Sequence, residues 1–220
     1  MTQQSRTIAF FDLDGTLVSC YTQKLLASKL LESRVINHLD ALVIGLWFGL
    51  YKIGLIRRTS SLRKIFYPCL ARVSRGEMSA IFNSVVENAL NDHVRDELVK
   101  IIQEYKSKGV YTCAVTATLD VMAEPICEHL DLDEIHSTRL EKTDGVYSGR
   151  WVGEVLEGPH KVAVMRLLAE KNHVQLQNCS AYADSYSDLE MLESVGRPVA
   201  VFPDAKLRAH ALRKKWTIIE

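Results

Sequence analysis

The stretch from Ile8 to Leu17 constrains the fold of this chain more than any other. Its first four residues, Ile8 to Phe11, are all apolar, a run too short for a helix and typical of a strand buried on both faces of a parallel sheet. Asp12 and Asp14 follow where this strand should end, and a glycine at position 15 lets the chain turn sharply. Open parallel sheets bind ligands beyond the carboxyl ends of their strands. The stretch therefore predicts an active site at this edge, or more simply an acidic turn that closes a strand.

Length and composition set the broad class of protein. A chain of 220 residues with 47% apolar and 25% charged residues suits one globular α/β core with a small insertion. The net charge of zero gives no sign of a nucleic-acid-binding protein. The N-terminus, Met1–Thr7, is polar and has no apolar signal segment, which argues against secretion. Five scattered cysteines without metal-ligand spacing predict reduced thiols and a cytoplasmic location. They are Cys20, Cys69, Cys113, Cys127 and Cys179.

From position 91 onward, predicted strands alternate with predicted helices. An apolar stripe from Val94 to Tyr105 indicates an amphipathic helix that Gly109 stops, and Asp144-Gly145 is a strong hairpin signal. This alternation predicts βαβ units with right-handed crossovers, and so a Rossmann-like three-layer α/β fold with a parallel sheet. The remaining predicted strands are 110–115, 137–143, 146–152, 179–183, 199–202 and 216–219. The remaining predicted helices are 119–130, 160–171, 189–194 and 205–215.

Residues 19 to 90 carry helical patterns and no strand signal. We expect them to form a small all-helical cap inserted after the first strand, with residues 1–18 and 91–220 as the α/β catalytic core. The predicted helices are 21–33, 41–56, 60–73 and 78–90, with Gly76 as the break between the last two.

Four motifs follow one another in a distinctive order. Phe11-Asp12-Leu13-Asp14-Gly15-Thr16-Leu17 comes first, Thr116 ends an apolar strand, Lys161 opens a helix, and the segment from Ala183 to Asp188 ends another strand. In this order they resemble the motifs of the haloacid dehalogenase (HAD) superfamily of phosphatases, most closely the phosphoserine-phosphatase-like branch, subfamily IB. The resemblance runs from about residue 7 to the C-terminus. The helical segment behind the first motif also matches the cap position of this branch.

The resemblance implies a phosphatase that hydrolyses a phosphate monoester through an aspartyl-phosphate. Asp12 would be the nucleophile, and Asp14 would protonate the leaving alkoxide and then take a proton from water. These two carboxyls need opposite protonation states at the start, which their environments must enforce. Lys161 would supply a fixed positive charge, although a lysine that opens a helix is ordinarily a solvated surface residue. The hydroxyl of Thr116 and the backbone N–H of Ala117 would bind phosphoryl oxygens.

The resemblance also implies a Mg²⁺ cofactor, which prefers oxygen ligands. Asp12 and Asp184 would be carboxylate ligands, together with the backbone carbonyl of Asp14. Asp188 would hold a metal-bound water or orient the metal ligands; alternatively, it is only a charge at the N-terminus of the next helix. Thr118 is a weaker candidate for the site, because a threonine after a strand is often only a helix N-cap.

The sequence does not determine the substrate. Family members that hydrolyse phosphoserine carry an acidic residue nine positions after the nucleophile, and here that position (12 + 9) is Tyr21. We expect a small phosphorylated, phosphoserine-like metabolite. The alternatives are a lipid phosphomonoester of the lysophosphatidate or phosphatidylglycerophosphate type, transfer of phosphate to an acceptor other than water, and a non-catalytic phospho-ligand sensor. A sensor is disfavoured because binding alone needs no nucleophile or acid.

The predicted cap contains an apolar run, Ala41–Ile56, beside a basic segment. Its 16 residues are fewer than the ~20 that a membrane span requires. We favour a buried central helix or a homodimer contact, since Ala41, Gly45 and Gly49 permit close helix approach. The alternative is a helix that rests on an anionic membrane surface. Between Asp40 and Glu77 there is no acidic residue but seven basic ones, namely Lys52, Arg57, Arg58, Arg63, Lys64, Arg72 and Arg75.

Overall fold

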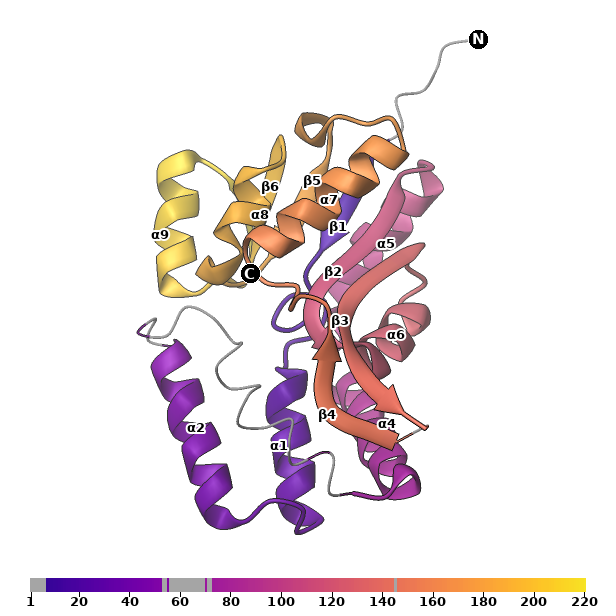
Figure 1. Cartoon of the computed structure of the whole chain (residues 1–220). Helices are drawn as coiled ribbons and strands as arrows, with labels where there is room; N and C mark the ends of the chain where they lie inside the picture. The colour runs from indigo at the N-terminus through magenta and orange to yellow at the C-terminus, as the bar shows by residue number, and fades with distance from the viewer. Residues whose placement is uncertain (1–6, 53–54, 56–69, 71–72, 145) are drawn as a thin grey trace.

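The computed structural model describes residues 7–52, 55, 70, 73–144 and 146–220 (Figure 1). Its centre is a seven-stranded sheet in the order β4-β3-β2-β1-β5-β6-β7. All neighbouring strands pair in parallel except β3 and β4, which form the predicted hairpin. The strands are β1 (Ile8–Phe11), β2 (Tyr111–Leu119), β3 (Glu134–Thr143), β4 (Val146–Val152), β5 (Ser180–Ala183), β6 (Arg197–Val201) and β7 (Thr217–Ile219).

Helices cover both faces of this sheet, which confirms the predicted three-layer α/β fold. In β1, Phe10 packs in one apolar cluster with side chains of α7, α8 and α9, whereas Phe11 belongs to the cluster on the opposite face with side chains of α5 and α6. The helices are α1 (Thr22–Glu32), α2 (His38–Lys52), α4 (Arg75–Asp92), α5 (Asp96–Ser107), α6 (Asp120–His129), α7 (Pro159–Lys171), α8 (Leu189–Glu193) and α9 (Ala205–Lys214), with the 3₁₀ turns η1 (Leu176–Asn178) and η2 (Tyr186–Asp188).

Strand β1 is buried on both faces, as its apolar run predicted. Each of its four residues is at most 1% exposed, and the strand pairs with β2 on one side and β5 on the other. Since all three strands are parallel, their carboxyl ends meet at one edge of the sheet. Residues that follow β1 and β5 are thereby brought together from opposite ends of the sequence.

The structure corrects several predicted boundaries. Strand β2 continues to Leu119 instead of ending at Val115, because its pairing with β3 resumes after an irregularity, at Leu119 opposite Thr138. Thr116 therefore lies within a strand. Strand β3 likewise begins at Glu134, three residues before the prediction.

The described elements between positions 19 and 90 are all helical: α1, α2 and α4. The predicted helix 60–73 lies almost entirely outside the described residues. Helix α2 begins three residues before the predicted start, and Lys52 is its last residue in the part of the chain that the structure describes. The prediction of a break at Gly76 was wrong, because α4 begins at Arg75 and the Ser74 side chain accepts a hydrogen bond from the Glu77 N–H as an N-cap. The division into core and cap stays a proposal.

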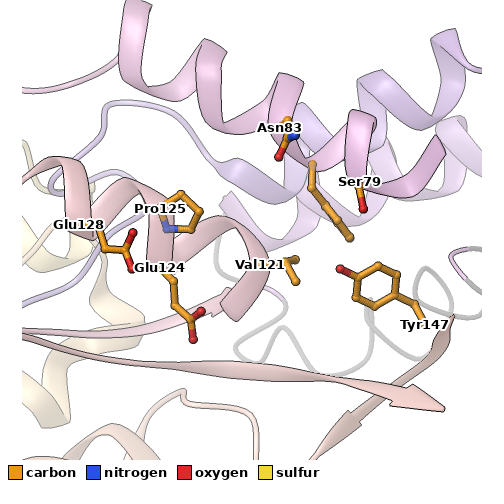
Figure 2. Close-up of a pocket in the computed structure, with 8 residues that line it drawn as sticks. Ser79, Asn83, Val121, Glu124, Pro125, Glu128 and Tyr147 are labelled. Atoms are coloured by element: carbon orange, nitrogen blue, oxygen red, sulfur yellow. The ribbon is translucent and has the colours of Figure 1, made fainter. Parts of the chain in front are cut away.

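Helix α4 packs against α1 and also against α6, and the rings of Phe82 and Tyr147 meet edge to face at 5.3 Å between centroids. Beside this contact α4, α6 and β4 line a hollow of about 240 Å³ (Figure 2). None of the predicted site residues lines it. Among the helices that the structure describes, none is both long enough and apolar enough to cross a membrane.

Candidate active site

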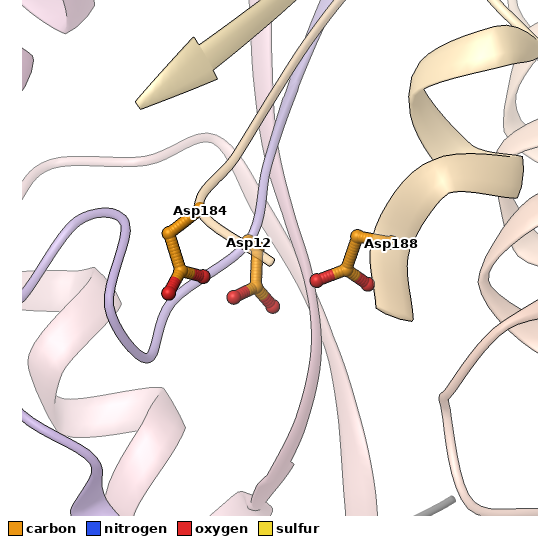
Figure 3. A group of neighbouring side chains, drawn as sticks. All are labelled: Asp12, Asp184 and Asp188. Atoms are coloured by element: carbon orange, nitrogen blue, oxygen red, sulfur yellow. The ribbon is translucent and has the colours of Figure 1, made fainter. Parts of the chain in front are cut away.

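The ends of β1 and β5 place three aspartates together. The Asp12 N–H donates to the Tyr182 carbonyl at 2.9 Å, and the strand register sets Asp12 level with Ala183, one residue before Asp184. Asp188 comes from the η2 turn just beyond. One carboxylate oxygen from each aspartate lies within 4.8 Å of the other two. Figure 3 shows Asp12 between its two neighbours.

Lys161, in the first turn of α7, lies among these carboxylates. Its ammonium is 2.6 Å from an oxygen of Asp12 and 2.6 Å from an oxygen of Asp188, and the residue is only 2% exposed. It is therefore not a solvated surface lysine. Burial by itself lowers the pKa of Lys161, but Asp12 and Asp188 outweigh burial and raise it, so the ammonium stays charged.

The aspartate cluster holds more negative than positive charge. Burial is the main reason that the pKa of Asp12 rises to about 7, against the opposing effect of Lys161. The pKa of Asp184 is also raised well above its usual range, by burial and then by its neighbours Asp12 and Asp188. Three carboxylates with one ammonium leave a buried, oxygen-only donor set that fits a hard divalent cation such as Mg²⁺.

Asp188 belongs to this cluster. Its side chain makes no capping hydrogen bond to α8 and instead forms the ion pair with Lys161. The alternative that Asp188 is merely a charge at a helix N-terminus therefore does not describe its contacts.

Asp14 has a different environment from Asp12, although it is two residues away. Its carboxylate accepts hydrogen bonds from the Thr22 N–H at 3.1 Å and the Thr22 hydroxyl at 2.9 Å. Burial raises the pKa of Asp14, and the bonds from Thr22 lower it only in part. The net shift favours a protonated carboxyl, which a general acid needs. Among the described residues, the carboxylate of Asp14 does not join the three-aspartate group.

Gly15 brings the loop after β1 against Asp184. Its φ is +79°, and a Cβ built on it would lie 2.2 Å from a carboxylate oxygen of Asp184. The Tyr21 hydroxyl donates to that same oxygen at 3.1 Å, and the Thr16 hydroxyl reaches the other at 3.4 Å. The Arg95 guanidinium donates to the Gly15 carbonyl at 3.3 Å. Only a glycine allows this approach of the loop to Asp184.

The threonines after Val115 form a buried group beside Asp14. Strand register places Thr116 one residue beyond the level of Asp12. Its hydroxyl accepts from the Thr118 N–H at 3.1 Å, and the hydroxyls of Thr118 and Thr22 lie 3.4 Å apart. The N-cap interpretation of Thr118 was wrong, because Leu119 holds that position before α6. Phosphate binding by Thr116 and Ala117 stays a prediction.

Sequence reasoning missed Thr16, Thr22 and Arg95 as neighbours of the site. Thr16 lies within the first motif but was given no role, and nothing in the local pattern marks Thr22 or Arg95, because their partners lie on other segments of the fold. Tyr21 was singled out only as a departure from the family pattern, and its contact with Asp184 could not be foreseen.

The structure is a Rossmann-like α/β fold with a group of buried carboxylates beyond the ends of β1 and β5. The chain belongs to the haloacid dehalogenase-like hydrolase family, whose model matches residues 9–193. It is 31% identical to phosphoserine phosphatase SerB1 of Mycobacterium tuberculosis, over 96% of this chain and 69% of that protein. It is 26% identical to a histidinol-phosphatase of Neisseria meningitidis, over 97% and 98%. These matches confirm the predicted family and phosphatase class.

The fold has a close counterpart among solved structures. A protein of unknown function from Bordetella pertussis Tohama I superposes with a TM-score of 0.85, at 24% identity and over 99% of both chains. At that identity the likeness concerns the fold alone.

Proposed function

We propose that this phosphatase is a Mg²⁺-dependent phosphomonoesterase that works through an aspartyl-phosphate on Asp12. The observation that carries the proposal is the contrast between two carboxyls at one strand end. Asp12 is paired with the buried ammonium of Lys161 at 2.6 Å, whereas Asp14 is held apart by Thr22. The ammonium favours the ionised form of Asp12, which a nucleophile needs, whereas burial favours the protonated form of Asp14 in spite of the bonds from Thr22.

In the first step, a carboxylate oxygen of Asp12 attacks phosphorus, and the bond from phosphorus to the alcohol oxygen breaks. Asp14 gives its proton to that oxygen, so the alcohol leaves neutral. In the second step, water attacks phosphorus while the Asp14 carboxylate takes one of its protons. The bond from phosphorus to Asp12 then breaks, which releases inorganic phosphate and restores both aspartates.

Positive charge must offset the repulsion between a carboxylate and a phosphate dianion. Lys161 provides one fixed charge and is held in place by Asp12 and Asp188. Asp12 and Asp184 would hold Mg²⁺ with the backbone carbonyl of Asp14, and the position of Asp188 in the cluster suits it to complete or orient that set. When bound, Mg²⁺ supplies positive charge next to the phosphoryl oxygens.

The test is release of inorganic phosphate from an aryl phosphate, with and without Mg²⁺, by the wild type and Asp12→Asn. We expect Asp12→Asn to lose at least about 10³-fold in kcat, since removing the nucleophile removes the covalent route. Asp144→Asn is the matched control, because Asp144 is exposed and its φ of +51° suits asparagine. If Asp12→Asn kept more than about a tenth of wild-type activity, a loss below ~1.4 kcal/mol, the nucleophile assignment would be wrong.

For the substrate we propose a small phosphorylated metabolite. The two relatives above are named for phosphoserine and histidinol phosphate, which are both phosphate monoesters of small molecules that also carry an amino group. Tyr21 stands where an acidic residue holds the phosphoserine ammonium in the family, and here its hydroxyl is engaged with Asp184. Comparing kcat/KM for phosphoserine, histidinol phosphate and lysophosphatidate tests this choice.

The same comparison tests the first alternative, and the yield of free phosphate in the presence of alcohols tests the second. A preference for lysophosphatidate would favour the lipid phosphomonoester, an alternative supported by exposed leucines on α2. Phosphotransfer predicts that added alcohols divert phosphate from water, so that less free phosphate appears per molecule of substrate consumed. An unchanged yield of free phosphate would support hydrolysis.

A further inference from the structure

Helix α2 has two apolar faces, and only one of them is covered. Ile44 and Trp47 are 5% and 7% exposed and belong to the large apolar cluster, on the side where α2 packs against α1. On the outer side lie Leu39, Leu42, Val43 and Leu46, at 73%, 67%, 47% and 65% exposure. Figure 1 shows α2 at the periphery of the molecule.

These four side chains form one continuous stripe, because their spacing of i, i+3, i+4 and i+7 lines a single helix face. The other large apolar side chains that are exposed in the described residues, such as Leu167 and Leu212, lie far from one another along the chain. We call these four residues the α2 stripe. Contiguous exposed apolar patches of this kind mark interaction sites on soluble proteins.

The length of α2 limits the ways in which this helix could bind a membrane. Its 15 residues make a helix about 22 Å long, shorter than the ~30 Å hydrocarbon core of a bilayer. Such a helix cannot cross, but it can lie in the interface with one apolar face inserted.

The sequence that follows Asp40 carries charge of one sign. Asp40, in the first turn of α2, accepts a hydrogen bond from the Asn37 N–H, and the sequence then has seven basic and no acidic residues before Glu77. Arg57 and Arg58 come only five and six residues after Lys52, the last residue of α2. An apolar stripe with basic neighbours matches an anionic lipid surface.

A second copy of the chain fits this stripe less well. The four side chains expose roughly 400 Å² of apolar surface, about half of what each partner of a specific dimer typically buries. A second copy would also offer no opposite charge to the basic segment after Asp40, because it carries the same segment with the same sign.

We propose that the outer face of α2 docks this protein on an anionic membrane surface, with the helix lying in the plane of the interface. The inference concerns where the enzyme works and is independent of the substrate and of the mechanism proposed above.

The experiment is co-sedimentation of the full chain with vesicles of phosphatidylcholine, with and without phosphatidylglycerol. The double variant Leu42→Gln/Leu46→Gln removes apolar contact without adding charge. The double variant Leu167→Gln/Leu212→Gln is the matched control, since those leucines are 66% and 62% exposed on α7 and α9. Thermal melting and aryl phosphatase activity without vesicles report whether each variant is folded, and we expect both to be unchanged.

We expect the wild type and the control to bind the anionic vesicles at least about tenfold better than neutral ones, and less at about 0.5 M than at about 0.05 M salt. We expect the α2 variant to lose about tenfold in binding. Light scattering identifies a dimer. A wild-type dimer that the α2 variant disrupts, equal binding by the α2 variant and the wild type, or a monomer that ignores both vesicle types would each overturn the proposal. Should the Gln pair unfold the protein, Leu42→Ser alone gives the same comparison.

Discussion

At the ends of β1 and β5, four charged side chains are almost fully buried, whereas on α2 four large apolar side chains are exposed. The difference shows that whether a side chain is buried depends on its contacts with neighbouring residues as well as on its polarity. Lys161 can leave water because Asp12 and Asp188 each contact its ammonium at 2.6 Å. Leu42 is 67% exposed because the described contacts of α2 with the core lie on its other face, at Ile44 and Trp47. The aspartate cluster is stabilised by ion pairs of defined geometry. The outer face of α2 has only apolar surface to offer to a binding partner.

Removal of the metal should have the largest effect on the charged region. We expect EDTA to reduce phosphatase activity to background, because three buried carboxylates would repel the phosphate with only one lysine to compensate. Asp184→Ala should raise the Mg²⁺ concentration for half-maximal activity by at least about tenfold, and Ca²⁺ should inhibit because it tolerates looser coordination. Equal activity with and without EDTA would refute the role of the metal.

The close approach of Gly15 to Asp184 can be tested with a single methyl group. Gly15→Ala would place a Cβ 2.2 Å from a carboxylate oxygen of Asp184, so we expect kcat/KM to fall by about 100-fold, or ~2.7 kcal/mol. Gly153→Ala is the control, because Gly153 has a similar φ of +72° and no atom within 4 Å of the added Cβ. This control introduces the same backbone strain at a positive φ but no clash with Asp184, so we expect its activity to equal that of the wild type. Similar activities for the two variants would show that the contact with Asp184 does not matter.

The two faces of α2 should differ in their effect on stability. Ile44→Ala removes a side chain that is 5% exposed and should lower the free energy of unfolding by about 2–3 kcal/mol. Leu42→Ala, at 67% exposure, should change it by less than about 0.5 kcal/mol. Urea unfolding of both variants gives the two values. Equal losses would mean that the outer face is covered in solution.

The smallest expected effect concerns the hydrogen bond from Tyr21 to Asp184. Tyr21→Phe removes a donor at 3.1 Å, which is worth about 0.5–1.5 kcal/mol net, so the Mg²⁺ requirement should rise by roughly 2- to 10-fold. Tyr111→Phe loses a comparable bond to Glu134, at 2.8 Å in β2, and should leave the Mg²⁺ titration unchanged. An unaltered requirement in Tyr21→Phe would show that this bond does not position Asp184.

The sequence predicted the sheet and the carboxylates after β1 because each has a local signal whose position the topology then determines. Lys161 has no such signal, and only its place in the order of the four motifs predicted it. The apolar run of β1 and its following carboxylates need only the rule that parallel strands end at one edge. By contrast, the bonds from Thr22 to Asp14 and from Tyr21 to Asp184 depend on how the loop after β1 folds back. The 3.6-residue period of α2 indicates a helix, but it cannot tell which apolar face has a neighbour.

Thr22 is both the first residue of α1 and the partner of Asp14. A tilt of α1 about its N-terminus would therefore carry the Thr22 hydroxyl away from that carboxylate. Under the mechanism proposed above, Asp14 is therefore oriented as a proton donor only while α1 keeps this position.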